Sequence, residues 1–238
     1  MKALFIAVVY QPLYNGLVFL MDILPWADAG VVVVLFTVLI KLILFPLSQK
    51  AVKTQLQMKG LEGRLNEIKK KYEKDAEGKA RAMMDLYKNE GINPFSGILL
   101  ILIQIPIILA LYFIFLRGGL PVINTDLLYG FVSVPTVDME FLGLLNIAEK
   151  SFILALAAGI SQFFQVRLAM PKLAASSGQK SFKEDLVRSM NLQMRYVMPV
   201  IVFFISFSIS GAVALYWTTS NIFAIGQELY ARKNRLKI

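Results

Sequence analysis

One lysine inside a long apolar run is the feature that most constrains this chain. Residues 36–47 read FTVLIKLILFPL, with Lys41 near the middle. A charge in the hydrocarbon core of a bilayer costs roughly 2.5–3.5 kcal/mol on insertion scales, so such charges are rare and usually functional. The next cation, Lys50, lies about 14 Å further along a helix, which is more than a lysine stem can reach. Lys41 therefore needs water or a polar partner within the membrane.

The composition indicates a polytopic membrane protein. Of the 238 residues 57% are hydrophobic, and the mean hydropathy is +0.61, too apolar for a soluble domain of this length. The chain has no cysteine and no histidine, which excludes disulfides, thiol nucleophiles, Ser-His dyads and Cys/His metal sites. No phosphate-binding loop or metal-binding helix motif occurs, so we expect no cofactor and no enzyme activity.

The predicted fold class is an all-α polytopic membrane protein, a bundle of five transmembrane helices with a cytoplasmic helical hairpin. The spans are expected at residues 30–49, 94–116, 150–170, 196–210 and 211–231. Pro46 should kink the first span or end its regular hydrogen bonding. Ser210-Gly211 is the only plausible turn between the last two spans.

The polar segment 50–93 carries the pattern of a helical hairpin. Apolar residues recur with the 3-4-3-4 spacing of a two-helix coiled coil, at Met58, Leu61, Leu65, Ile68 and Tyr72. The pattern stops near residues 75–78 and then resumes. Gly60 and Gly63 weaken the first arm by up to about 1 kcal/mol each relative to alanine, so we expect a bend there.

The N-terminal segment 1–29 allows two interpretations. Leu13, Leu17 and Leu20 fall on one helical face and Asn15 lies off it, which favours an amphipathic helix in the outer interface. The alternative is a sixth span over residues 3–24, against which Pro12 weighs.

The distribution of cations predicts the orientation. Most Lys and Arg residues lie in segments 50–93, 171–195 and the basic tail 232–238, whereas only Lys2, Arg117 and Lys150 fall on the other side of the predicted spans. The positive-inside rule therefore places those three segments in the cytoplasm and the loop 117–149 outside.

Several strings together resemble the family of YidC-type membrane protein insertases. They are FTVLIKLILFPL, MKGLEGRLNEIKKKYEKD (58–75), NPFSGILLILIQIPIILALY (93–112), AGISQFFQ (158–165) and LYWTTSN (215–221). Each string alone is modest support, but five in the right order are specific, and they cover essentially the whole chain. The chain departs from the family pattern at Lys41, where arginine is usual, and at Ile98, Leu100, Ser210 and Ala212.

The resemblance implies a protein of the bacterial plasma (inner) membrane that inserts nascent membrane proteins and helps them fold. It implies a hydrophilic, positively charged groove in the inner leaflet, lined by Lys41, Thr37, Gln162 and Trp217, with Ser220 and Asn221 as weaker candidates. The implied partners are nascent membrane proteins and the lipid bilayer, with no sequence-specific nucleic acid binding. Whether the general secretory translocon and the ribosome take part stays open.

Each groove residue has a structural alternative. Lys41 could bind carbonyl groups inside the bundle, Thr37 could bond to its own backbone, and Trp217 could be an interfacial belt residue. Gln162 could form a structural hydrogen bond between helices, and we interpret Gln104 in the same way.

Two other function classes compete with the insertase. A small-solute or anion transporter could use an intramembrane lysine, but no acidic residue sits deep in a predicted span, since Glu228 is near the cytoplasmic end, and inverted repeats are absent. A passive assembly scaffold would tolerate loss of Lys41 but not loss of the hairpin.

Overall fold

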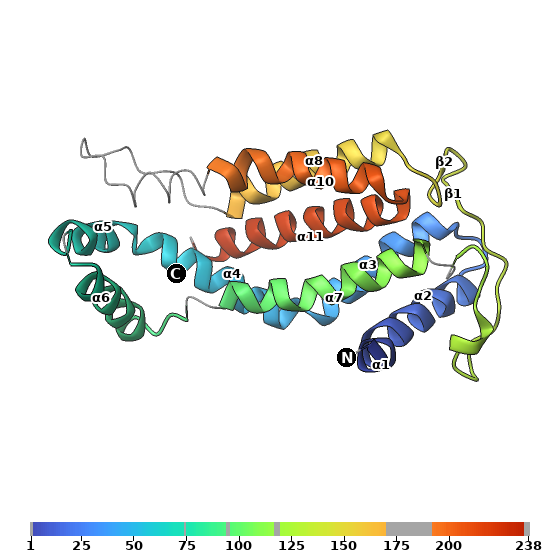
Figure 1. Ribbon diagram of the computed structural model, residues 1–238, viewed down its shortest axis with the longest axis horizontal. Coiled ribbons are helices and arrows are strands. Elements are labelled where there is room, and N and C mark those ends of the chain that lie inside the picture. Colours follow the sequence, from blue (N-terminus) through green and yellow to red (C-terminus); the bar gives the residue numbers. More distant parts are fainter. Residues whose placement is uncertain (1, 74, 94–95, 117–119, 170–191, 236–238) are drawn as a thin grey trace. The chain divides into compact units, whose positions relative to one another are not determined.

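The computed structural model describes residues 2–73, 75–93, 96–116, 120–169 and 192–235, and most of these are helical (Figure 1). Most of the predicted loop 171–195 and residues 236–238 of the predicted tail lie outside the described residues. The chain forms two compact units, residues 1–43 with 104–226 (unit 1) and residues 44–103 with 227–238 (unit 2).

The helices of the described residues fit a membrane protein. By length and composition, Ile6–Ile23 and Phe152–Ala169 can each cross a bilayer, and Ala29–Ile43 with Phe45–Gly60 adds a third span if the broken pair is counted as one. Leu102–Phe115 and Gln193–Ser208 are shorter apolar helices. Because Ile6–Ile23 is long and apolar enough to span, both interpretations of the N-terminal segment, the interfacial helix and the sixth span, stay open at this point.

Unit 1 holds most of the apolar helices. In chain order its elements are α1 (Lys2–Phe5), the π-helix η1 (Ile6–Tyr10), α2 (Gln11–Ile23), α3 (Ala29–Ile43), the 3-10 turn η2 (Thr125–Leu127), strands β1 (Glu140–Phe141) and β2 (Leu145–Asn146), α8 (Phe152–Ala169), the π-helix η3 (Gln193–Val197) and α10 (Met198–Ser208). Helices α7 (Ser96–Leu116) and α11 (Gly211–Arg235) carry residues of both units. The short antiparallel pair β1–β2 is an addition to the all-α prediction.

The segment around β1 and β2 fixes where two helices begin. Asp28 accepts hydrogen bonds from the backbone N–H of Val31 (2.9 Å) and of Leu142 (3.0 Å), which caps the first turn of α3. The N–H of Gly211 donates to the Glu149 carbonyl (2.7 Å), at the start of α11. A side chain at Gly211 would meet Leu154 at 3.1 Å, so glycine permits this close approach.

Helix α2 is anchored to the segment 124–129 through a buried asparagine. Asn15 is 3% exposed. Its amide nitrogen donates to the Leu127 carbonyl (2.8 Å), and its Oδ1 accepts from the N–H of Tyr129 (2.6 Å). Gln11 also donates to the Leu127 carbonyl, at 3.1 Å. Asn15 lies off the apolar face of Leu13, Leu17 and Leu20, yet it is buried because segment 124–129 covers it and supplies its hydrogen-bond partners.

Helices α8, α10 and α11 lie side by side in unit 1 (Figure 1). Gly159 of α8 faces α10, where an added Cβ would lie 3.1 Å from the Phe203 Cβ and 3.2 Å from the Pro199 carbonyl oxygen. Small residues let membrane helices approach closely and gain dispersion contacts. Gly159 therefore allows the tight packing of α8 on α10.

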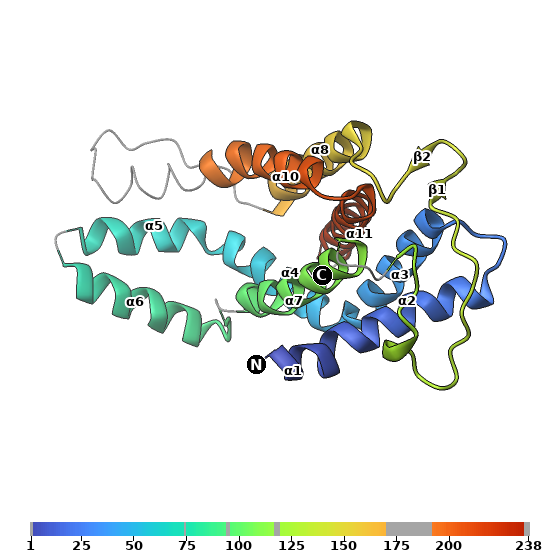
Figure 2. The same cartoon turned by 45° about the vertical axis from the view of Figure 1, so that its right-hand side comes forward.

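Unit 2 contains α4 (Phe45–Gly60), α5 (Glu62–Lys71) and α6 (Ala76–Asn89). Helices α5 and α6 lie side by side (Figure 2), joined by a core of Leu61, Leu65, Leu86 and Ile92. Arg64 forms an ion pair with Glu90, and Asp75 caps α6 by accepting from the N–H of Gly78 (2.9 Å).

The end of α11 carries a buried carboxylate in unit 2. Glu228 is buried and contacts Arg232 at 3.0 Å and Lys59 of α4 at 3.6 Å. The amide of Gln227 donates to the Ser48 hydroxyl at 2.7 Å. Two basic side chains thus offset the cost of burying the carboxylate.

Helix breaks occur where the sequence weakens the helix. Regular structure stops at Leu44, and Pro46 lies in the first turn of α4, where its missing N–H costs nothing. A second break at Leu61 follows Gly60.

We predict that Gly159→Val lowers the melting temperature of the protein in detergent, because overpacking costs about 1–3 kcal/mol. Gly226 is the matched control, since an added Cβ there meets nothing within 4 Å. Gly226→Val should leave the melting temperature nearly unchanged. Equal melting temperatures for the two variants would contradict close α8–α10 packing.

Candidate functional site

Lys41 lies on α3 and binds a neutral partner on α7. Its Nζ donates to Oε1 of Gln104 at 3.2 Å. The lysine is partly buried, and both residues belong to unit 1. An amide oxygen can accept from an ammonium without carrying a charge of its own. The cation therefore has one polar partner in this contact and keeps its net charge.

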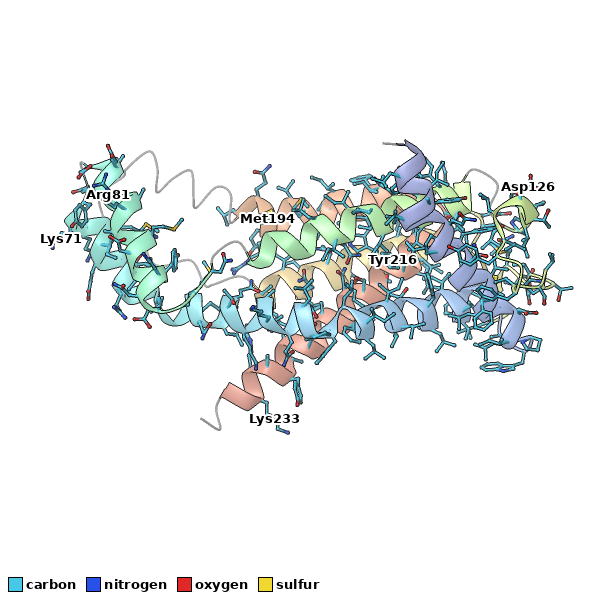
Figure 3. All side chains as sticks on the ribbon, turned by 90° about the horizontal axis from the view of Figure 1, so that it is seen from below. Lys71, Arg81, Asp126, Met194, Tyr216 and Lys233 are labelled. Carbon is cyan, nitrogen blue, oxygen red and sulfur yellow. The ribbon has the colours of Figure 1, made fainter. Side chains whose placement is uncertain are left out.

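Gln104 in turn binds Tyr216 of α11, which is 1% exposed and lies among the helices in Figure 3. The Gln104 Nε2 donates to the tyrosine hydroxyl. Since an ammonium can only donate, the amide oxygen must face Lys41 and the amide nitrogen must face Tyr216. Lys41, Gln104 and Tyr216 thus form a chain of hydrogen bonds across three helices, which we call the lysine relay.

A second polar contact begins at the next residue of α11. The indole Nε1 of Trp217 donates to Oε1 of Gln162 on α8 at 3.1 Å, and Gln162 Nε2 lies 3.4 Å from Gln165 Oε1. Of the residues predicted to line one groove, Gln162 and Trp217 are in direct contact. Lys41 belongs to the lysine relay, which ends at Tyr216, the residue before Trp217.

The other predicted site residues, Thr37, Asn221 and Ser220, are buried. Thr37 is fully buried and its hydroxyl donates to the Val33 carbonyl at 2.6 Å, which is the backbone-bonded alternative. Asn221 is 6% exposed and donates to the Ser161 hydroxyl of α8 at 3.1 Å. Ser220 is 7% exposed.

The lysine relay contains no carboxylate. The sequences of α3, α7, α8 and α10 have no Asp or Glu, and no ion pair found in the described part of the chain includes Lys41. No cluster of three or more potential metal ligands occurs among the described residues. The site can thus attract an anionic group by its charge.

Sequence reasoning missed part of this site. Gln104 was predicted to form hydrogen bonds between helices, and it does, but it was not predicted to be the partner of Lys41. Tyr216 and Ser161 were not predicted as site residues. The available signal was a lone amide, Gln104, in the apolar run LLILIQIPIIL, and a tyrosine beside a candidate groove tryptophan. A pocket of about 380 Å³ lined by residues 25–28 and 136–138 contains none of the predicted site residues.

Comparison with known proteins gives consistent matches over most of the chain. The family model described as "60Kd inner membrane protein" matches residues 20–237. A membrane protein insertase YidC of Clostridium tetani is 31% identical over 209 residues, which cover 88% of this chain and 84% of that relative. The YidC of Oceanobacillus iheyensis is 31% identical over 209 residues (86% and 74%), and that of Oleidesulfovibrio alaskensis is 30% identical over 218 residues (92% and 37%).

The contact between Trp217 and Gln162 should be visible in tryptophan fluorescence. The chain has two tryptophans, so Trp26→Phe leaves Trp217 as the only reporter. In that background, Gln162→Leu removes a hydrogen bond and a dipole from the indole, and we expect its emission maximum to move to shorter wavelength. Gln227→Leu, which changes an amide in unit 2, should leave the maximum in place. An unchanged maximum in the Gln162→Leu variant would show that the two side chains are not in contact.

Proposed function

This chain belongs to the family of the 60Kd inner membrane protein, and we propose that it is an insertase that moves nascent membrane proteins into the bilayer. The observation that carries the proposal is Lys41, an intramembrane cation held by an amide rather than by a carboxylate. An ionisable residue in a membrane helix is costly, so it is a candidate functional site by default. The family description places such proteins in the inner membrane.

The sequence and the helices support one arrangement in the membrane. We propose five spans, with the helix pair α5–α6, the segment 171–195 and the C-terminus in the cytoplasm. Ala29–Ile43 with Phe45–Gly60 and Phe152–Ala169 supply candidate spans, and the cations of segments 50–93 and 171–195 supply the orientation.

Helix α2 in this arrangement lies along the outer interface. If α2 stood along the bilayer normal, Gln11 would lie about 18 Å deeper than Ile23. Yet Gln11 and Asn15 bind Leu127, while Ala29, just after α2, donates to the Asp138 carbonyl at 2.7 Å. Both ends of the segment contact the same extracytoplasmic loop, which supports the interfacial position over a sixth span.

The proposed groove has Lys41, Gln162 and Trp217 at its surface. Thr37, Ser220 and Asn221 form a polar wall behind it, since all three are buried. Water in the groove hydrates the polar tail of an arriving substrate and shortens the distance that this tail spends in hydrocarbon. The lysine attracts acidic residues of the tail, and this attraction is screened less than in bulk water.

Insertion by this route needs no covalent chemistry. A substrate helix of roughly 20 apolar residues gains free energy by partitioning into lipid, which drives its release sideways from the groove. Nascent membrane proteins are the proposed substrates. The basic tail 232–238 offers electrostatic contact to either lipid head groups or RNA.

The transporter alternative is less well supported. Coupled transport through the membrane uses ionisable groups near the bilayer midplane. Helices α3, α7, α8 and α10 carry no acidic residue, and Glu228 is bound by Lys59 and Arg232 in unit 2.

Substitutions of Lys41 test the proposed function. In proteoliposomes, Lys41→Glu should reduce insertion of a substrate with an acidic extracytoplasmic tail by about tenfold or more, because repulsion replaces attraction. Lys41→Ala should reduce it less, and Lys41→Arg should retain most of it, since the charge is kept.

Lys50→Glu is the matched control for the Lys41 series, because Lys50 is exposed and belongs to α4, beyond the helix break at Leu44. It should insert the same substrate at nearly the normal rate. Normal insertion by Lys41→Glu would rule out the proposed role of the lysine.

A further inference from the structure

We propose that Gln104 sets the charge selectivity of the site: it holds Lys41 with a neutral acceptor, so that the charge of the cation remains available to acidic substrate tails, and Tyr216 positions the Gln104 amide. This inference rests on the proposed insertase function and adds two residues that govern which substrates are preferred.

The first step is the chemistry of the Lys41 contact. An ammonium has three N–H donors, and one of them is directed at Gln104 Oε1 at 3.2 Å. A lone lysine among apolar helices would be costly, and one hydrogen bond to an amide reduces that cost. The remaining donors can serve water or a substrate carboxylate.

The second step is the charge of the partner. A carboxylate at the position of the Gln104 amide would form an ion pair with Lys41 and cancel most of its field. Glutamate has nearly the shape of glutamine, so Gln104→Glu would neutralise Lys41 without removing it. Because α3, α7, α8 and α10 contain no acidic residue, the introduced carboxylate would be the only one on these four helices.

The third step is the orientation of the amide. Gln104 Nε2 donates to the hydroxyl of Tyr216, a side chain that is 1% exposed. If the amide turned over, its NH₂ group would face the ammonium and repel it. Tyr216→Phe removes one oxygen and leaves the ring, so it releases this constraint with little change in packing. Tyr216 is thus a positioning residue that acts through Gln104.

The test uses two single-span substrates that differ only in the extracytoplasmic tail, one with Asp and Glu residues and one with Asn and Gln in their place. Purified full-length protein in proteoliposomes is assayed for insertion of each substrate, and the ratio of acidic-tail to neutral-tail insertion is the readout. A merely structural defect would lower both rates and leave the ratio unchanged.

We expect Gln104→Glu to lower the ratio about fivefold, as Lys41→Ala does, because each variant removes the net positive charge of the site. Tyr216→Phe should lower the ratio by a smaller factor, about threefold, because the amide keeps its place but loses its fixed orientation. Gln57→Glu is the matched control, since it makes the same change at an exposed position of α4 that is not among the groove residues. It should leave the ratio at the wild-type value.

The outcomes separate the inference from the proposed function. If Lys41→Ala lowers the ratio and Gln104→Glu does not, the inference is wrong while the proposed function stands. A Gln104→Glu variant that loses both substrates equally would also overturn the inference, because Gln104 would then be structural. If Lys41→Ala itself leaves the ratio unchanged, the role of the lysine in the proposed function is wrong.

Discussion

The hydrogen bond between Lys41 and Gln104 is the contact on which the rest of the site depends. A cation in an apolar helix is costly unless a polar group meets it. A carboxylate partner would lower the free-energy cost of burying the lysine by cancelling its charge. Gln104 lowers part of that cost through a hydrogen bond and leaves the charge in place. The contact requires α3, α7 and α11 to hold a fixed register, because Tyr216 orients the same amide.

That register is set in part at the N-terminal ends of α3 and α11, which contact the segment that contains β1 and β2. Asp28 and the Asp138 carbonyl bind the first residues of α3, and the carbonyls of Ile147 and Glu149 bind the first residues of α11. One short segment therefore fixes the starts of the helices that carry Lys41 and Tyr216. Helices α8 and α10 pack closely because Gly159 has no side chain at their contact.

The sequence was sufficient for properties that depend on nearby residues. The mostly helical membrane protein class, the family and the break before Pro46 follow from composition, motifs and the chemistry of proline. The partners of Gln104 and Asn15 could not be predicted, because they lie on distant segments and depend on how the helices are rotated against each other. Thr37 shows the same limit: spacing places it on the Lys41 side of α3, but only the packing reveals a fully buried hydroxyl bonded to Val33.

Access of water to position 41 decides between a wet groove and a dry structural lysine. The chain has no cysteine, so Lys41→Cys introduces a single thiol that can be labelled with a membrane-impermeant reagent from either side. The proposed groove predicts labelling from the cytoplasmic side only. Absence of labelling from both sides would contradict the groove, and labelling from both sides would instead indicate a continuous pathway, as in a transporter.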